Sequence, residues 1–258
     1  MGAFSIKIKY TFQMDSTTDI KKIILAEDES LLVIDKPSGL VVNKSQTQRE
    51  ITLQELVHEY LKLAPNDLGV GERSGIVHRL DKDTSGLILI AKTKNMFEYL
   101  QERFKNHQIK KTYLALLHGK MVEDMVTVDA PIGRNPKNRL KFAIVEGARD
   151  AKTEFVLLNR YSRKLGNEYN YYSYVSVLPQ SGRTHQIRVH SASLNQPVVS
   201  DPIYLGRRRL KDDLKMCPRL FLHASEISFS DPKTSETRQF RSVLPTNLQN
   251  VLNKLDKG

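Results

Sequence analysis

The chain has 258 residues and one cysteine, Cys217, so it can bury a sizeable core but cannot form an intrachain disulfide framework. Lysine and arginine number 40 against 29 aspartate and glutamate residues, and the net charge of +11 fits a polyanionic partner as well as a merely basic soluble protein. No run approaches the ~18 consecutive apolar residues of a membrane span, and the N-terminus lacks the apolar core of a signal peptide. We therefore expect a cytoplasmic protein with no membrane partner.

The first part of the chain predicts short strands and one helix. Residues 4–12 alternate apolar and polar side chains, which is typical of a half-buried strand, and a polar connection follows over 14–20. The apolar run 31–34 predicts a buried strand that ends in the turn 35–39. Leucine, valine and tyrosine at helical spacing then predict an amphipathic helix over about 52–63.

The remainder of the chain predicts mostly strands. A buried strand over 87–91 precedes a helix over about 94–106, and a final helix occupies about 246–256. The other predicted strands are 112–117, 153–159, 171–178, 219–229 and 238–243. Because no regular strand–helix–strand alternation appears, a doubly wound parallel sheet is excluded in favour of an α+β fold with a largely antiparallel, mixed sheet core and flanking helices. We expect residues 1–20 to form an N-terminal strand and connection, and residues 21–258 a single domain.

Basic side chains gather in three separate clusters along the chain. A disordered basic tail would form one continuous block, whereas several clusters suit a groove assembled from different loops. This distribution favours a nucleic acid as the partner. The clusters are Lys105, Lys110 and Lys111; Arg134, Lys137, Arg139 and Lys141; and Arg207, Arg208, Arg209, Lys211, Lys215 and Arg219.

The densest group of polar side chains lies in residues 75–86, just before the predicted strand 87–91. Asp81 can act as a nucleophile or a base, and Arg79 and Lys82 beside it favour its ionised form. A tight turn that uses these polar side chains for bonds to the backbone is the alternative. Taken alone, an aspartate in such a loop is more often structural than catalytic.

Two further segments carry side chains suited to chemistry. Residues 179–190 combine a glycine turn with Arg183, whose guanidinium suits a buried carboxylate, although an exposed arginine is the alternative. His185 and His190 have no third ligand at a recognised spacing, so we expect no metal site. Tyr113 follows two lysines in a predicted strand, where it can stack on a nucleobase or be an ordinary strand tyrosine.

Together these segments resemble the RluA-type family of RNA pseudouridine synthases, and the resemblance spans about residues 24–245. It implies the pseudouridine synthase catalytic fold for residues 21–258. Only about twenty residues precede the matched region, which implies a member that has no N-terminal S4-like RNA-binding domain or has lost one. The matching segments, in the family's order, are 27–40, His78–Asp81 with Thr84–Gly86, Lys111–Tyr113, Gly182–His190, Pro197–Asp201 with Tyr204–Gly206, and Leu222–Ala224.

The resemblance implies that Asp81 is the catalytic residue, either attacking the sugar carbon C1′ or removing the C2′ proton to give a glycal. Arg183 would pair with Asp81, lowering its pKa and fixing its geometry. Tyr113 would stack on the uracil and assist proton transfer at C5. Ile187 would close the opposite side of the base pocket.

The resemblance also implies an RNA substrate whose target uridine leaves its stack. His78, Arg79 and Thr84 are expected in the base pocket and in contact with RNA, Arg79 being the better candidate to fill the space that the base leaves. Ribosomal RNA is somewhat favoured over transfer RNA. The reaction is an isomerisation, so we expect no cofactor and no metal, and we also expect a monomer with no obligate protein partner.

Two other functions were weighed against this one. A catalytically inactive RNA-binding or ribosome-assembly protein on the same fold would need no nucleophile, which argues against it when Asp81, Tyr113 and Arg183 are all present. A phosphotransferase is excluded because the His-Arg-Leu-Asp string differs from the kinase His-Arg-Asp loop and no glycine-rich loop accompanies it.

Overall fold

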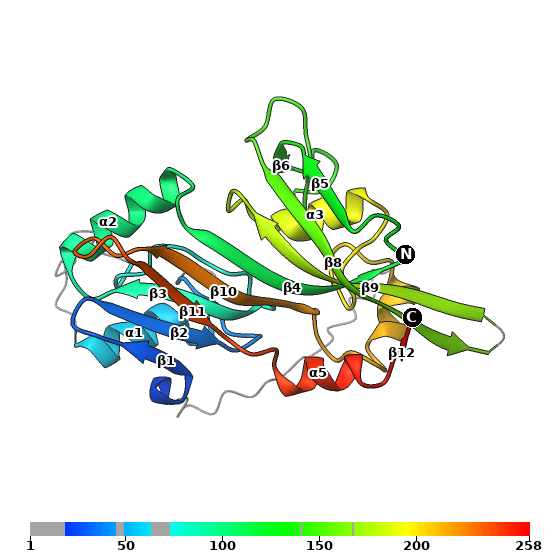
Figure 1. Cartoon of the computed structure of the whole chain (residues 1–258), viewed down its shortest axis with the longest axis horizontal. Helices are drawn as coiled ribbons and strands as arrows, with labels where there is room; N and C mark the ends of the chain where they lie inside the picture. The colour runs from blue at the N-terminus through cyan, green and yellow to red at the C-terminus, as the bar shows by residue number, and fades with distance from the viewer. Residues whose placement is uncertain (1–18, 45–48, 63–72, 140, 167) are drawn as a thin grey trace.

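The computed structural model describes residues 19–44, 49–62, 73–139, 141–166 and 168–258. The predicted strand 4–12 lies outside these residues, as does nearly all of the predicted connection 14–20. Within the described part of the chain, one mixed sheet of ten strands forms the centre of the fold (Figure 1). The strand order is β1-β2-β3-β10-β4-β9-β8-β12, with β11 paired to β10 and β5 paired to β8.

The strands of the large sheet pair antiparallel except where β3 meets β10. This confirms the predicted α+β class with a largely antiparallel, mixed sheet. The strands are β1 (Ile24–Glu27), β2 (Leu31–Lys36), β3 (Ser85–Ala91), β4 (Lys110–His118), β5 (Met125–Asp129), β8 (Lys152–Leu165), β9 (Glu168–Pro179), β10 (Leu222–Ser230), β11 (Thr237–Arg241) and β12 (Asp256–Lys257). A separate two-stranded sheet contains β6 (Ile132–Arg134) and β7 (Phe142–Ile144).

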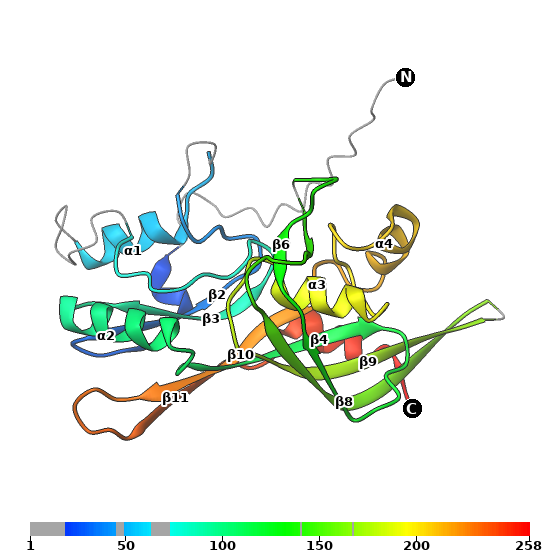
Figure 2. The same ribbon diagram turned by 90° about the horizontal axis from the view of Figure 1, so that it is seen from above.

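Helices cover the sheet at both ends of the molecule (Figures 1 and 2). They are α1 (Leu53–Leu61), α2 (Lys94–Lys105), α3 (Gln186–Ser193), α4 (Arg207–Asp213) and α5 (Thr246–Leu252), with a short 3-10 helix η1 (Ile20–Ile23) before β1. The helices α1, α2 and α5 confirm the three predicted ones, but α5 ends earlier than predicted because the chain turns into β12, which pairs with β8. The helices α3 and α4 were not predicted.

The strand β3 lies in the middle of the N-terminal half and is buried along its whole length. Ile88 and Ile90 pack in the cluster that contains the apolar face of α1, whereas Leu87 and Leu89 pack in the cluster that contains the apolar face of α2. Side chains alternate between the two faces of a strand, so the part covered by a helix on each face, 87–91, is apolar at every position. This arrangement explains the continuous apolar run in the sequence.

Gly86 fixes how β3 meets the C-terminal half of the chain. Its φ of +112° lies in a region that suits glycine, and a Cβ at this position would stand 2.2 Å from the carbonyl oxygen of Ala224. The two backbones pair in parallel at Gly86 and Ala224, and at Ser85 and His223. The loop that carries Asp81, four residues upstream of Ser85, is thereby held at the centre of the sheet.

Candidate active site

The three segments singled out in the sequence converge on one pocket, which we call the Asp81 pocket. It opens between the loop before β3, the strand β4 and the turn from β9 into α3. Its lining residues are Arg79, Leu80, Asp81, Thr84, Tyr113, Pro179, Ser181, Gly182, Arg183, His185, Gln186, Ile187, Arg188 and Leu222.

The carboxylate of Asp81 is held by a buried arginine. Its side chain is 21% exposed, and Oδ2 accepts a hydrogen bond from Nη1 of Arg188 at 3.0 Å. The Nε2 atom of His185 lies 3.8 Å from the same oxygen. The other oxygen, Oδ1, makes no hydrogen bond with the described residues, so it is available to a bound molecule.

Arg188 bridges two carboxylates. Its Nε and Nη2 donate to Oδ2 and Oδ1 of Asp201 at 2.7 and 2.8 Å, a bidentate pair with both side chains almost fully buried. Asp201 also accepts from the backbone N–H groups of Ile203 and Tyr204. Burial alone would lower the pKa of Arg188, but the hydrogen bonds and charge of Asp201, together with Asp81, raise it above its ordinary value. The guanidinium is therefore a fixed positive charge. Its remaining nitrogen, Nη1, faces Asp81.

The turn before α3 is tied to the sheet by Gln186. Its Oε1 accepts from the hydroxyl of Ser181 and the backbone N–H of Arg183, and its Nε2 donates to Lys152 and Thr153 on β8. His185, at the start of the helix, has a left-handed φ of 58°. These contacts set the rotation of α3, and with it the direction of Arg188.

The prediction that Arg183 pairs with Asp81 is wrong. Nε of Arg183 donates instead to the backbone carbonyl of Asp150 at 3.1 Å, and the side chain lies at the rim of the pocket. The reason is that residues 181–185 form a turn and the helix begins only at Gln186. Arg188, on the buried face of that helix, takes the position that the sequence reasoning gave to Arg183. The signal available in the sequence was that Arg188 lies in the same short segment as Arg183.

Tyr113, Ile187, Thr84 and Arg79 all line the Asp81 pocket. Burial, together with the nearby charge of Asp81, raises the pKa of Tyr113 well above its ordinary value, so its hydroxyl is protonated at neutral pH. Ile187 is buried, and the backbone N–H of Thr84 donates to the carbonyl of Asp81 at 3.2 Å, which closes the loop. Arg79 is exposed at the edge.

His78 does not line the pocket, contrary to the prediction. Its Nε2 accepts the backbone N–H of Leu89 at 2.9 Å, and its ring stacks on Phe104 with the centroids 4.6 Å apart. Burial, aided by the charge of Lys111, lowers the pKa of His78 to about 3. The side chain points toward β3 and α2, where a neutral ring is needed to accept the bond.

The lowered pKa of His78 predicts a loss of stability in acid. Below pH ~6.5 the unfolded chain takes up a proton that the native ring refuses, so the free energy of unfolding falls as pH falls, by at most about 1.4 kcal/mol per pH unit from this group. The His78→Gln variant, whose amide oxygen can accept the same bond, should show a shallower slope. Denaturant unfolding between pH 4.5 and 7 measures both slopes, and parallel curves would contradict the prediction.

Lys36 contacts the loop that carries Asp81, and sequence reasoning did not single it out. Its Nζ is fully buried and donates to the carbonyl oxygens of Pro37, Leu40 and Lys82 at 2.9, 2.9 and 3.1 Å. Burial, opposed by the charges of Asp83 and Asp81, lowers its pKa to about 7. The side chain of Lys36 thus links the turn after β2 to the loop that carries Asp81. The Lys-Pro turn in the sequence was the only signal.

Two kinds of feature are absent from the part of the chain that the structure describes. Among these residues, no three His, Cys, Asp or Glu side chains gather as a metal site would require. In the same part of the chain, no helix has both the length and the apolar character needed to span a membrane.

Comparisons with known proteins point to one family. A model of the family described as RNA pseudouridylate synthase matches residues 30–193. The chain is 37% identical over 245 residues to ribosomal large subunit pseudouridine synthase D of Xanthomonas campestris pv. campestris, covering 92% of this chain and 70% of that protein. It is also 37% identical over 233 residues to the protein of the same name from Nitrosomonas europaea, covering 89% of this chain and 64% of that protein. The chain thus spans about two thirds of the length of these relatives. Among solved structures, human RNA pseudouridylate synthase domain containing 1 matches with a TM-score of 0.71 at 26% identity, over 91% of this chain and 88% of that one.

Proposed function

Because this chain belongs to the RNA pseudouridylate synthase family, we propose that it converts uridine to pseudouridine in RNA, with Asp81 as the catalytic carboxylate. One observation carries the assignment to Asp81. Its Oδ2 is held by the buried Arg188, while Oδ1 is free of hydrogen bonds to the described residues and the side chain is partly exposed in the pocket. A carboxylate fixed at one oxygen and open at the other suits attack on a substrate atom or removal of a proton from it.

The reaction breaks the N1–C1′ bond of uridine, turns the base, and forms a C5–C1′ bond as the C5 proton leaves. Asp81 either attacks C1′ or takes the C2′ proton, and both routes need it ionised. Arg188 supplies the contact that fixes the orientation of the carboxylate. Its own position is set by Asp201 and not by the substrate, so the contact exists before RNA binds.

Tyr113 and Ile187 form the apolar part of the proposed base pocket. We infer that Tyr113 contributes its ring and a neutral hydroxyl, because its raised pKa makes a phenolate rare at neutral pH. The hydroxyl can donate or relay a proton, but the base that removes the C5 proton is then a different group. The target uridine must leave its stack, which costs a few kcal/mol. Arg79, exposed at the pocket edge, is the residue we propose to fill the vacated space.

We propose ribosomal RNA of the large subunit as the substrate, with transfer RNA as the alternative. The support is the name of the relatives that match most of this chain. The test uses transcripts of both RNAs labelled with tritium at C5 of uridine. We expect the purified chain to release tritium from the ribosomal transcript, because C5 loses its hydrogen when it bonds to C1′. An inactive RNA-binding protein would bind the transcript and release none, and release from neither RNA would contradict the proposal.

A further inference from the structure

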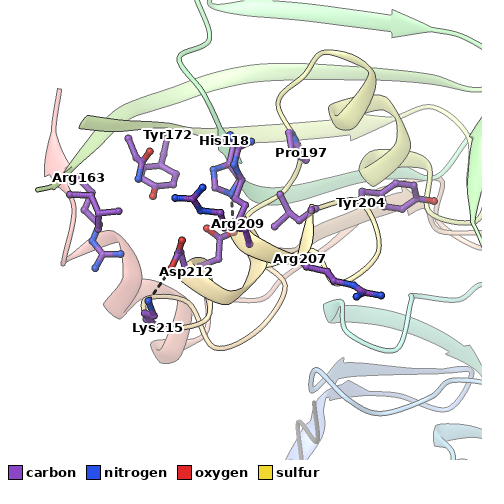
Figure 3. A pocket seen from close by; sticks show the side chains of 15 residues that line it. His118, Arg163, Tyr172, Pro197, Tyr204, Arg207, Arg209, Asp212 and Lys215 are labelled. Atoms are coloured by element: carbon purple, nitrogen blue, oxygen red, sulfur yellow. Dashed lines mark hydrogen bonds and ion pairs between the residues drawn. The ribbon is translucent and has the colours of Figure 1, made fainter. Parts of the chain in front are cut away.

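A second cavity has a volume of about 800 Å³, and Figure 3 shows the side chains that line it. Its walls are α4, the loop before it, and the β8–β9 hairpin at Arg163 and Tyr172. His118, at the end of β4, also lines it. Apart from His118 on β4, no lining residue comes from the segments that converge on Asp81, and the reaction does not require this cavity.

The cavity carries an excess of unpaired positive charge. The two carboxylates that line it already have partners: Asp212 pairs with Lys215 at 2.9 Å, and Asp213 pairs with His118 at 2.8 Å. By contrast, four lining guanidinium groups form no ion pair and donate no hydrogen bond among the described residues. These groups belong to Arg163, Arg207, Arg208 and Arg209.

The arginines approach the cavity from different elements. Arg163 comes from β8 and Arg209 from α4, and both charges act on the hydroxyl of Tyr172, where they oppose the effect of burial and of Asp213 on its pKa. Figure 3 shows Arg209 near His118 and Tyr172, with Arg163 on the hairpin side and Arg207 on the side of Tyr204. Guanidinium groups that line one cavity from separate elements suit an anion with several charged groups, such as a phosphodiester chain.

Tyr204 joins this cavity to the Asp81 pocket. It lines the cavity, while its hydroxyl lies 3.1 Å from Nδ1 of His185 and its ring centroid 5.3 Å from the guanidinium carbon of Arg188. The same short segment supplies Asp201, which anchors Arg188. Tyr204 and Asp201 therefore place the wall of the basic cavity next to the side chains that hold Asp81.

We propose that this cavity binds the sugar–phosphate backbone of the substrate RNA outside the target nucleotide. The inference rests on the proposed function, because it takes RNA as the substrate. RNA is favoured over a small free anion because the charges are spread over two walls of a large cavity that adjoins the reacting site. Contacts to phosphates position a nucleic acid without reading its sequence, so the site would add affinity for RNA that extends beyond the target stem-loop.

The test compares the Arg163→Gln/Arg209→Gln variant with the Lys233→Gln/Lys254→Gln variant, which removes two exposed charges elsewhere. Binding is measured at several salt concentrations with a long ribosomal RNA transcript and with a short stem-loop that contains the modified uridine. For the arginine variant we expect about tenfold weaker binding of the long RNA and a salt slope lower by roughly 1.5 to 2. Binding of the short stem-loop, and kcat on the long RNA at saturation, should stay within twofold of wild type.

Three outcomes would overturn the inference. One is a Kd and salt slope for the long RNA equal to those of the lysine variant. Another is equal weakening for both RNAs, which would place the contact at the target stem-loop. The third is competition by inorganic phosphate at this cavity with no change in long-RNA binding, which would mark a site for a small anion. Because binding is measured apart from tritium release, a chain that binds through this cavity but releases no tritium would contradict only the proposed reaction.

Discussion

Replacing Asp81 by asparagine is expected to abolish pseudouridine formation while RNA affinity changes little. An amide at this position cannot attack C1′ or hold a proton at neutral pH, so we expect turnover to fall by at least about 10³-fold. The fold should tolerate the change, because the amide oxygen can still accept the bond from Arg188 and Asp201 still balances the buried guanidinium. RNA contacts outside the carboxylate are unaltered.

The measurement is single-turnover tritium release, with RNA binding and thermal unfolding recorded on the same preparation. Asp83→Asn is the matched control, because it removes a carboxylate from the same loop. The side chain of Asp83 does not line the Asp81 pocket. We expect the control to retain activity within about tenfold of wild type. If Asp81→Asn keeps turnover within tenfold while the fold is intact, Asp81 is not the catalytic residue.

Replacing Arg188 by glutamine is expected to impair both stability and turnover. It leaves Asp201, which is fully buried, without its cation, and breaking such a pair costs about 3–5 kcal/mol. Turnover should fall by about 10²-fold among the folded molecules, because Asp81 loses the contact that orients it. Unfolding in denaturant and tritium release per folded molecule measure the two effects separately.

A second variant separates the two roles of Arg188. Arg188→Gln/Asp201→Asn removes both buried charges, so it should recover part of the lost stability but none of the lost turnover. Arg183→Gln is the comparison within the same segment, and it should cost less than tenfold because that side chain bonds a backbone carbonyl and no carboxylate. If Arg183→Gln reduced turnover more than the double variant, the assignment of the orienting role to Arg188 would be wrong.

Sequence patterns predicted those parts of the fold in which side-chain burial follows the period of the backbone. The fully buried β3 and the amphipathic α1 and α2 were located within a few residues, because each buries a regular set of side chains. The helix α3 was missed for the opposite reason. It buries three polar side chains, those of Gln186, Arg188 and His190. Their partners lie on β8 and at residues 130 and 201, so a polar side chain in this segment did not indicate an exposed position.

The site was predicted only in part, because its buried polar side chains have partners that lie far away in the sequence. The resemblance to the RluA-type family implied that Asp81, Tyr113 and Ile187 meet near the turn at Arg183. Which arginine reaches Asp81 depended on where α3 begins, and that is set by the bonds of Gln186 to β8. The direction of His78 depended on the stacking partner Phe104, 26 residues away on another element.

The parallel pairing of β3 with β10 also governs when the molecule can become active. Ser85 and His223, joined by a hydrogen bond, are 138 residues apart, so this contact closes a very long loop. Contacts between such distant residues form slowly and late in folding. During synthesis, the loop that carries Asp81 cannot dock on its neighbouring strand until β10 has left the ribosome. A nascent chain therefore completes its N-terminal strands and helices well before it acquires a reactive centre.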